Sequence, residues 1–271
     1  MSTPHYNQLL LSPAQRDLIE VVLVSPRNPL NIGAVARAMA NFGFERLSVV
    51  APYAPHWREA KSAVGAPELL QQARETATLA EAVSQCAFVI GTGTLTHRKP
   101  DQQVVTLPEI AMHLQAALRQ RGRIALVLGP EKHGLTRDDL SYCHVLLEIP
   151  TDPRQPSMNL GQAAAVCLYE IACRSWEVED DSQGEVCEFP PFDQTAAETM
   201  ERGAPSALLD RAADLIEETM IAAHYSPESM QAANRYDVRV MLRRMNLSAL
   251  DARRIMGLFR RILRSLQAPR N

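Results

Sequence analysis

Short apolar runs alternate with amphipathic stretches along the first 175 residues of the chain. Five runs rich in β-branched side chains are bounded by glycine, proline or polar residues, which is typical of strands buried on both faces. They are Ile19–Val24, Leu47–Val50, Ala87–Ile90, Ile124–Leu128 and Val145–Ile149. Helix-like stretches lie between them, at Asn31–Phe42, a broken region over Ala66–Gln85, Leu107–Arg121 and Asn159–Trp176. This alternation predicts βαβ units and a mostly parallel sheet, and therefore an α/β fold.

Two of these segments have recognisable helix ends. The stretch Asn31–Phe42 has one apolar face and stops before Gly43, a residue that commonly ends helices. Thr136 and Asp139 have the spacing of a capping box, so a helix is predicted to begin after Thr136.

The pattern changes after residue 176. Residues 177–204 are acidic, contain Pro190 and Pro191 and have little periodicity, which is typical of a linker. Helical periodicity returns in Ser206–Ala223, Pro227–Arg235, Asp237–Met245 and Ser248–Leu266. The sequence therefore predicts an α/β domain at 1–176, an acidic linker at 177–204 and a small all-helical domain at 205–271.

Charge is distributed unevenly, although the formal net charge is only -3. Nine acidic residues and no basic one lie between Trp176 and Glu201, whereas ten arginines and two aspartates lie between Arg235 and Asn271. Because the guanidinium fork suits phosphates and stacked bases, the second segment predicts a nucleic-acid surface. A merely solvated helix face is the alternative. The candidate RNA-binding residues are Arg239, Arg243, Arg244, Arg253, Arg254, Arg260 and Arg261.

The composition is that of a globular protein, with 46% hydrophobic residues. No apolar run approaches the roughly 18 residues that a membrane span needs, and Met1–Leu11 lacks a signal-peptide pattern. The five cysteines form no CxxC pair and no zinc-binding spacing. These observations predict a cytoplasmic, reduced protein without a metal.

Candidate chemistry lies in the loops after the predicted strands, because ligands bind at the carboxyl ends of strands in open α/β sheets. The nucleotide-binding motifs are missing there. Gly91-x-Gly93-x-x-Thr96 lacks the third glycine of a dinucleotide fingerprint, and there is no P-loop. This absence disfavours an NAD-dependent dehydrogenase.

Three other motifs occur in order at the strand ends. They are Asn31-x-Gly33-x-x-x-Arg37, Gly129-Pro130-Glu131-x-x-Gly134-Leu135, and Ile149-Pro150 with Ser157-Met158-Asn159-Leu160. Residues 19–175, which contain them, resemble the SpoU (TrmH) family of S-adenosylmethionine-dependent RNA 2′-O-ribose methyltransferases of the SPOUT class. The third motif, followed by a helical extension, most resembles the TrmJ-type tRNA branch. That branch usually has Arg in place of Pro130, Leu in place of Met158 and Ser-Ala in place of Gly93-Thr94.

The resemblance implies an α/β trefoil knot, S-adenosylmethionine as cofactor, and a homodimer whose sites lie near the subunit interface. It also implies the residues that bind the cofactor, largely through backbone groups. These are Thr92, Gly93, Thr94, Gly129, Ile149, Pro150, Ser157, Met158 and Leu160.

The resemblance makes Arg37 the catalytic arginine. Two roles stay open: a base assisted by an RNA phosphate, or a group that grips the phosphate and polarises the 2′-hydroxyl. A free guanidinium is too basic for an ordinary general base, which favours the second role.

The remaining catalytic candidates are polar residues of the three motifs. Asn31 would orient Arg37 or the substrate, with helix capping as its alternative, and Glu131 would hold the arginine or a backbone amide. Ser157 and Asn159 would contact substrate and cofactor, and Asn159 also precedes a helix that it could cap.

The resemblance predicts methyl transfer to a ribose 2′-hydroxyl of tRNA, at nucleotide 32 of the anticodon loop, on cytidine or uridine. An rRNA 2′-O-methyltransferase is the near alternative. A non-catalytic RNA-binding protein with the same fold would be expected to have lost Arg37, Glu131 or Asn159, and all three are present. A DNA-binding regulator would leave the α/β domain without a role. The resemblance implies no role for His97 or His133, and RNA contact is the role left open for them.

Overall fold

The computed structural model describes residues 11–94, 100–120, 122–173 and 203–268. Within them the chain forms a seven-stranded, entirely parallel sheet with strand order β3-β2-β1-β6-β4-β7-β5. The strands are β1 (Ile19–Val24), β2 (Arg46–Val50), β3 (Arg74–Thr76), β4 (Cys86–Thr92), β5 (Gln103–Thr106), β6 (Arg123–Leu128) and β7 (Val145–Glu148). This order brings the carboxyl ends of β6, β4 and β7 side by side at one edge of the sheet.

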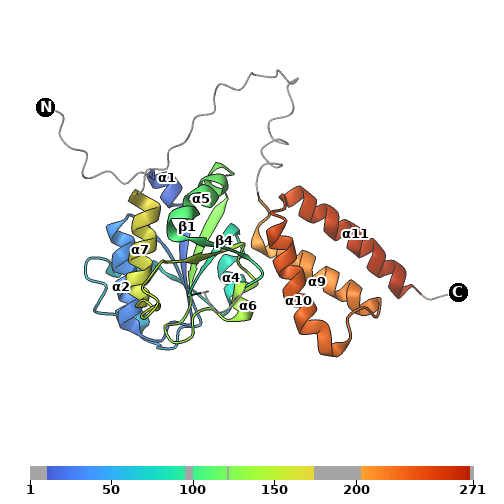
Figure 1. Ribbon diagram of the computed structural model, residues 1–271, viewed down its shortest axis with the longest axis horizontal. Coiled ribbons are helices and arrows are strands. Elements are labelled where there is room, and N and C mark those ends of the chain that lie inside the picture. Colours follow the sequence, from blue (N-terminus) through green and yellow to red (C-terminus); the bar gives the residue numbers. More distant parts are fainter. Residues whose placement is uncertain (1–10, 95–99, 121, 174–202, 269–271) are drawn as a thin grey trace, which may run out of the picture.

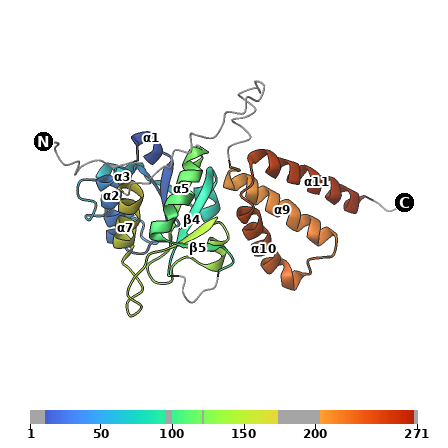
Figure 2. The same ribbon diagram turned by 45° about the horizontal axis from the view of Figure 1, so that its top comes forward.

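Helices cover both faces of the sheet (Figures 1 and 2). The helical segments of this part are α1 (Pro13–Arg16), α2 (Pro29–Asn41), α3 (Pro67–Gln72), α4 (Leu79–Val83), α5 (Ile110–Arg119), α6 (Arg137–Leu140) and α7 (Leu160–Cys173), with 3-10 turns at Trp57–Glu59 and Leu107–Glu109. Helices α2, α5 and α7 bury the larger apolar core, whereas α4 and α6 bury the smaller one. Strand β1 supplies Val21 and Leu23 to the first core and Val22 and Val24 to the second. A strand with both faces covered is mostly apolar, which explains this run; its one charged residue, the buried Glu20, pairs with Arg74 at 3.1 Å.

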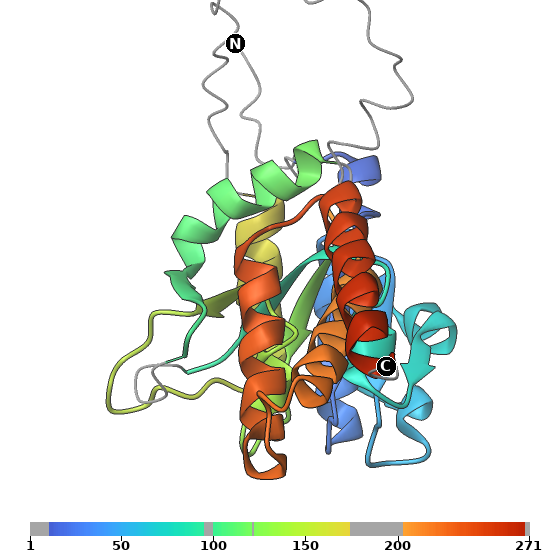
Figure 3. The ribbon, with the colours of Figure 1, turned by 90° about the vertical axis from the view of Figure 1, so that its right-hand side faces the viewer.

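The C-terminal part is helical, with α9 (Ser206–Ala222), a 3-10 turn at Glu228–Met230, α10 (Gln231–Arg244) and α11 (Ala249–Gln267). Helix α9 packs against both α10 and α11 around a small core that includes Ile216, Leu242 and Met256. Figure 3 shows these helices in front of the sheet domain, and α9 packs on α4. The Ser206 hydroxyl donates to the Cys86 carbonyl at 3.0 Å. The helical part is thereby joined to the start of β4.

The predicted α/β fold with a helical C-terminal region is confirmed, and the five predicted strands are present with ends that differ by at most two residues. The structure adds β3 and β5, which are short edge strands with exposed residues and therefore lack an apolar run. The broken region over Ala66–Gln85 contains α3, β3 and α4. The Pro227–Arg235 and Asp237–Met245 segments were predicted apart but lie mostly within one helix, α10.

The capping box at Thr136 is confirmed. Its hydroxyl accepts a hydrogen bond from the Asp139 amide at 3.1 Å, and the Asp139 carboxylate accepts one from the Thr136 amide at 2.8 Å. Most of the predicted linker 177–204 lies outside the described residues, but Ala204 belongs to the helical part because its amide donates to the Leu247 carbonyl at 2.8 Å. Among the described helices, none is both long and apolar enough to cross a membrane.

Candidate active site

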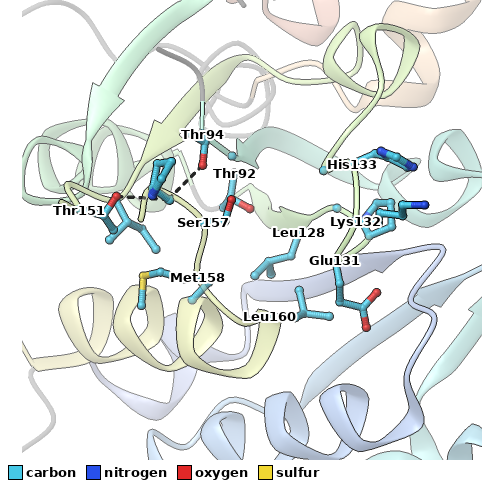
Figure 4. Close-up of a pocket in the computed structure, with 17 residues that line it drawn as sticks. Thr92, Thr94, Leu128, Glu131, Lys132, His133, Thr151, Ser157, Met158 and Leu160 are labelled. Carbon is cyan, nitrogen blue, oxygen red and sulfur yellow. Dashed lines mark hydrogen bonds between the residues drawn. The ribbon is translucent and has the colours of Figure 1, made fainter. Parts of the chain in front are cut away.

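A cavity of about 250 Å³ opens at the carboxyl ends of β4, β6 and β7. Three loops enclose it, at residues 92–94, 128–134 and 149–158, and the first turns of α7 complete it. Its walls combine apolar side chains, among them Leu128, Met158 and Leu160, with the hydroxyl groups of threonines and Ser157 (Figure 4). An apolar wall facing a polar rim suits a ligand with a flat aromatic part and a polar part.

Eight of the nine residues predicted to bind a cofactor line this cavity. They are Thr92, Gly93, Thr94, Gly129, Ile149, Ser157, Met158 and Leu160. The ninth, Pro150, lies in a neighbouring depression beside Thr106 and Pro153. Sequence reasoning missed Lys132, Thr151 and Pro156, which also line the cavity. Their only sequence signal is that they adjoin motif residues.

Hydrogen bonds hold the three loops together. The Thr94 and Thr151 hydroxyls both donate to the Pro156 carbonyl at 3.2 Å, so one carbonyl joins the loop after β4 to the loop after β7. The Thr92 hydroxyl donates to the Val127 carbonyl at 3.0 Å and ties β4 to β6. The shape of the cavity is therefore set by contacts between segments 35 to 62 residues apart in the chain.

Gly129 is required by close packing of the loop after β6. A Cβ atom at this position would lie 2.3 Å from the Leu135 amide nitrogen and 2.5 Å from the Gly134 carbonyl carbon. Such backbone contacts cannot be relieved by moving a side chain, so the loop can fold back on itself only with glycine here. Gly134 itself has a φ of 64°, in the left-handed region that favours glycine.

Glu131 joins the first and second motifs. Its carboxylate accepts hydrogen bonds from the Asn31 side-chain amide at 2.8 Å and from the backbone amides of Arg27 at 3.1 Å and Asn28 at 3.2 Å. Burial raises the pKa of Glu131, but these hydrogen bonds outweigh it and hold the pKa below its ordinary value. Glu131 thus binds backbone amides, one of the two roles expected for it, and its carboxylate stays ionised at neutral pH.

Asn159 extends this network to the third motif. Its side-chain NH₂ group donates to the Asn31 side-chain oxygen at 3.0 Å, while its own oxygen accepts from the Gly161 amide at 2.9 Å. Asn159 therefore caps α7 and fixes Asn31 as well. The alternative that Asn31 caps its helix is wrong, because Asn28 is the cap of α2 and accepts from the Leu30 amide at 3.0 Å.

Arg37 is exposed on α2 and does not line the cavity. The described residues give it no hydrogen bond, ion pair or stacking partner, and Glu131 binds Asn31 and two backbone amides instead. Within one chain, therefore, the structure brings together Asn31, Glu131 and Asn159 but leaves the predicted catalytic arginine outside the group.

The candidate RNA-binding arginines fall into two groups. Arg244, Arg253, Arg254, Arg260 and Arg261 are exposed. Arg243 is 1% exposed, and its guanidinium pairs with Asp210 at 2.7 Å. Arg239 pairs with Asp138 at 3.2 Å and lies over the Tyr142 ring at 4.7 Å. The prediction for Arg243, and to a lesser degree Arg239, is corrected, since these side chains join the helical part to the sheet domain instead of facing solvent.

Comparison with known proteins gives the family. The model of the SpoU rRNA methylase family matches residues 18–169. A tRNA (cytidine/uridine/adenosine-2′-O-)-methyltransferase TrmJ of Pseudomonas aeruginosa strain UCBPP-PA14 is 38% identical over 181 residues, which cover 66% of this chain and 68% of the relative. A tRNA (cytidine-2′-O-)-methyltransferase TrmJ of Methanocaldococcus jannaschii is 38% identical over 156 residues, 57% of this chain and 67% of the relative.

A solved structure extends the likeness to the helical part. The crystal structure of TrmJ from Z. mobilis ZM4 matches with a TM-score of 0.73 and 28% identity, covering 90% of this chain and 98% of that one. The range matched by the family model contains all three motifs and the loops that enclose the cavity. The chain therefore belongs to the SpoU methylase family, as an enzyme of the TrmJ type.

Proposed function

We propose that the protein transfers a methyl group from S-adenosylmethionine to the ribose 2′-hydroxyl of nucleotide 32 in the anticodon loop of tRNA, in the cytoplasm. The observation that supports this most is the convergence of the second and third motifs and the loop after β4 on one cavity, with the first motif joined to them by the Glu131–Asn31–Asn159 network. The tRNA substrate is proposed from the TrmJ-type relatives, whose names specify tRNA 2′-O-methylation.

The cavity suits S-adenosylmethionine chemically. Leu128, Met158 and Leu160 offer an apolar surface for the adenine ring, and the hydroxyls and backbone groups of Thr92 and Ser157 offer partners for the ribose and the amino-acid part. When bound, the cofactor supplies a methyl group already activated on a sulfonium ion, so the protein has to align the acceptor and manage its proton.

The polar network gives this alignment a rigid frame. The ionised Glu131 fixes the backbone at residues 27 and 28, and the two asparagines tie α2 to the start of α7. Hydrogen bonds to Glu131 of the second motif and Asn159 of the third thus hold the Asn31 side chain in one orientation. We assign it, with Glu131 and Asn159, to positioning the RNA ribose against the cofactor.

Arg37 grips an RNA phosphate and polarises the 2′-hydroxyl. Its exposed guanidinium, without a partner among the described residues, is available for a phosphate, for which its planar fork is well suited. In the proposed homodimer, α2 and α7 form the interface, and Arg37 of one protomer acts at the cavity of its partner. Exposed apolar side chains on these helices support the interface: Leu30 is 55%, Val166 37% and Tyr169 57% exposed.

The test is methyl transfer by the full chain to an unmodified tRNA transcript with labelled S-adenosylmethionine. We expect one ribose methyl per tRNA, mapped to nucleotide 32. The matched control is the same tRNA with a single 2′-deoxynucleotide at position 32, which should accept no methyl. Methylation of the deoxy control would show that another nucleotide is the target, and methylation of rRNA but not tRNA would favour the rRNA alternative.

A further inference from the structure

A second cavity, of about 620 Å³, lies between the sheet domain and the helical part. It shares two wall residues, His133 and Gly134, with the first cavity. Its other walls are the start of α6 on one side and Tyr236 of α10 on the other, with Asp101 at the rim. The proposed function uses none of this cavity beyond the shared loop. A group bound here would lie directly next to the methyl-transfer site.

Arg137 forms a flat platform in this cavity. Its guanidinium lies over the Tyr236 ring, 4.1 Å from the centroid. The tyrosine is 7% exposed, whereas Arg137 is exposed and lines the cavity. One side of the guanidinium is therefore covered by the ring, and its exposed side lines the cavity, where a second flat group can contact it. Stacking on a buried ring also limits the orientations of the arginine, so the platform is preorganised.

The edge of the platform offers both hydrogen-bond donors and acceptors. Asp101 presents a carboxylate that is hydrogen-bonded to the Tyr236 side chain, and the neighbouring Gln102 side chain donates to the Leu140 carbonyl in α6 at 2.6 Å. His133 presents an imidazole, and Figure 4 shows its side chain directed away from Met158 and Ser157 of the first cavity.

The charges around the cavity distinguish between ligand classes. Arg137 faces Asp101 across the same cavity, and Asp138 beside it is paired with Arg239. A site for a phosphate would be expected to have excess positive charge, whereas here acids and bases balance. A neutral, flat group with N–H and C=O edges fits better. Unpaired nucleobases have this chemistry, and proteins bind those of RNA loops by stacking on aromatic rings or arginine planes and by hydrogen bonds to their edges.

We propose that this cavity binds an unstacked nucleobase of the RNA substrate, adjacent to the nucleotide whose ribose is methylated. The base stacks on the exposed side of Arg137, and Asp101 accepts a hydrogen bond from its edge. This inference rests on the proposed function, because it requires a single-stranded RNA loop at the first cavity. If this cavity binds the base, the contact between the sheet domain and the helical part helps to select the RNA substrate.

The experiment combines one variant with an abasic scan of the RNA loop. We expect Arg137→Ala to raise the KM for tRNA about 10- to 100-fold, the range of base-stacking contributions, with kcat within about twofold and with calorimetric binding of S-adenosylmethionine unchanged. In the wild-type protein, removing the base at one flanking position should raise KM similarly. The two changes together should cost no more than either alone, because they remove the same contact.

The matched control is Arg58→Ala. Arg58 also stacks on a buried ring, 4.2 Å from the Trp57 centroid, and pairs with an acid, Glu75, but it lies away from both cavities. It should leave KM unchanged. As a second probe, Asp101→Asn should alter which base is preferred at the flanking position, since an amide can also donate.

Two results would overturn the proposal: a normal KM for folded Arg137→Ala, or additive effects of Arg137→Ala and every abasic substitution. Failure of the proposed function gives a different result, since wild-type protein would then methylate no intact tRNA.

Discussion

At the residue scale, Arg37 is the side chain on which the proposed chemistry depends most. Arg37→Ala should abolish methyl transfer, because no other side chain of the first motif has a guanidinium that can bind a phosphate through two hydrogen bonds. Arg37→Lys should also be poor, since a point charge cannot replace bidentate contacts. Single-turnover assays on tRNA measure this, with S-adenosylmethionine affinity and thermal stability as controls that should not change. Near-normal turnover by Arg37→Ala would refute the assignment.

His144 makes folding stability depend on pH. Its Nδ1 accepts a hydrogen bond from the Val89 amide at 3.1 Å, and burial, with a smaller effect of Arg243, lowers its pKa to about 3. The unfolded chain binds this proton near pH 6.5. The contribution of neutral His144 is therefore complete above pH 6.5 and is lost as pH falls toward 3, by up to about 1.4 kcal/mol per pH unit.

The variant His144→Asn tests this dependence, because an asparagine oxygen can replace Nδ1 as acceptor and does not titrate. Denaturant unfolding at pH 7, 6, 5 and 4 should show a shallower loss of free energy of unfolding for the variant than for wild type. Parallel pH profiles of the two proteins would contradict the role given to His144.

At the element scale, the contact of α10 with α6 and α9 decides how the two parts of the chain are joined. Arg243 is buried between Asp210 of α9 and the Tyr142 ring, 5.3 Å away. Removing one partner of a buried ion pair leaves the other charge uncompensated. Arg243→Ala should therefore lower the free energy of unfolding by about 3–5 kcal/mol.

Arg244 is the matched control, since it is the next residue of the same helix and is exposed. Arg244→Ala should change the free energy of unfolding by less than about 0.5 kcal/mol. Both values come from denaturant titrations at one pH. Equal stabilities of the two variants would mean that the buried pair does not hold this junction together.

At the scale of the whole molecule, α11 is the surface we propose for phosphate contact. Replacing Arg253, Arg260 and Arg261 with glutamine should weaken tRNA binding and flatten its salt dependence, because each lost phosphate contact lowers the slope of log affinity against log salt by about 1. The triple lysine variant should keep the slope. Substitution is a sharper test than deleting residues 205–271, because deletion would also uncover Tyr142 and the start of β4.

Filter binding at several salt concentrations and sedimentation on the same samples complete this test. Both variants should keep the oligomeric state and S-adenosylmethionine binding of the wild type. An unchanged salt slope in the glutamine variant would mean that RNA is bound elsewhere. A changed oligomeric state would mean that α11 supports assembly.

The elements and the cavity were largely predictable from the sequence for a physical reason. A strand buried on both faces is mostly apolar, as in Ile19–Val24 with Glu20 as its one charged residue, and the loops at strand ends converge once the sheet is parallel. The residues predicted to bind the cofactor therefore line one cavity, with Pro150 as the exception. Edge strands such as β3 escaped prediction because exposed short strands need no apolar pattern.

Only the tertiary structure decided which partners the polar side chains meet. Asn31 is hydrogen-bonded to Glu131, 100 residues further along the chain, and to Asn159, 128 residues further along. No local spacing in the sequence predicts these hydrogen bonds. Arg243 and Arg253 look alike in the sequence, yet one is buried by the docking of α10 on the sheet domain and the other is exposed. The sequence by itself determined the elements, the motifs and the charge of the last helices. Long-range packing determined which arginines are exposed, because the burial of a side chain depends on the surfaces brought against it and not on its neighbours along the chain.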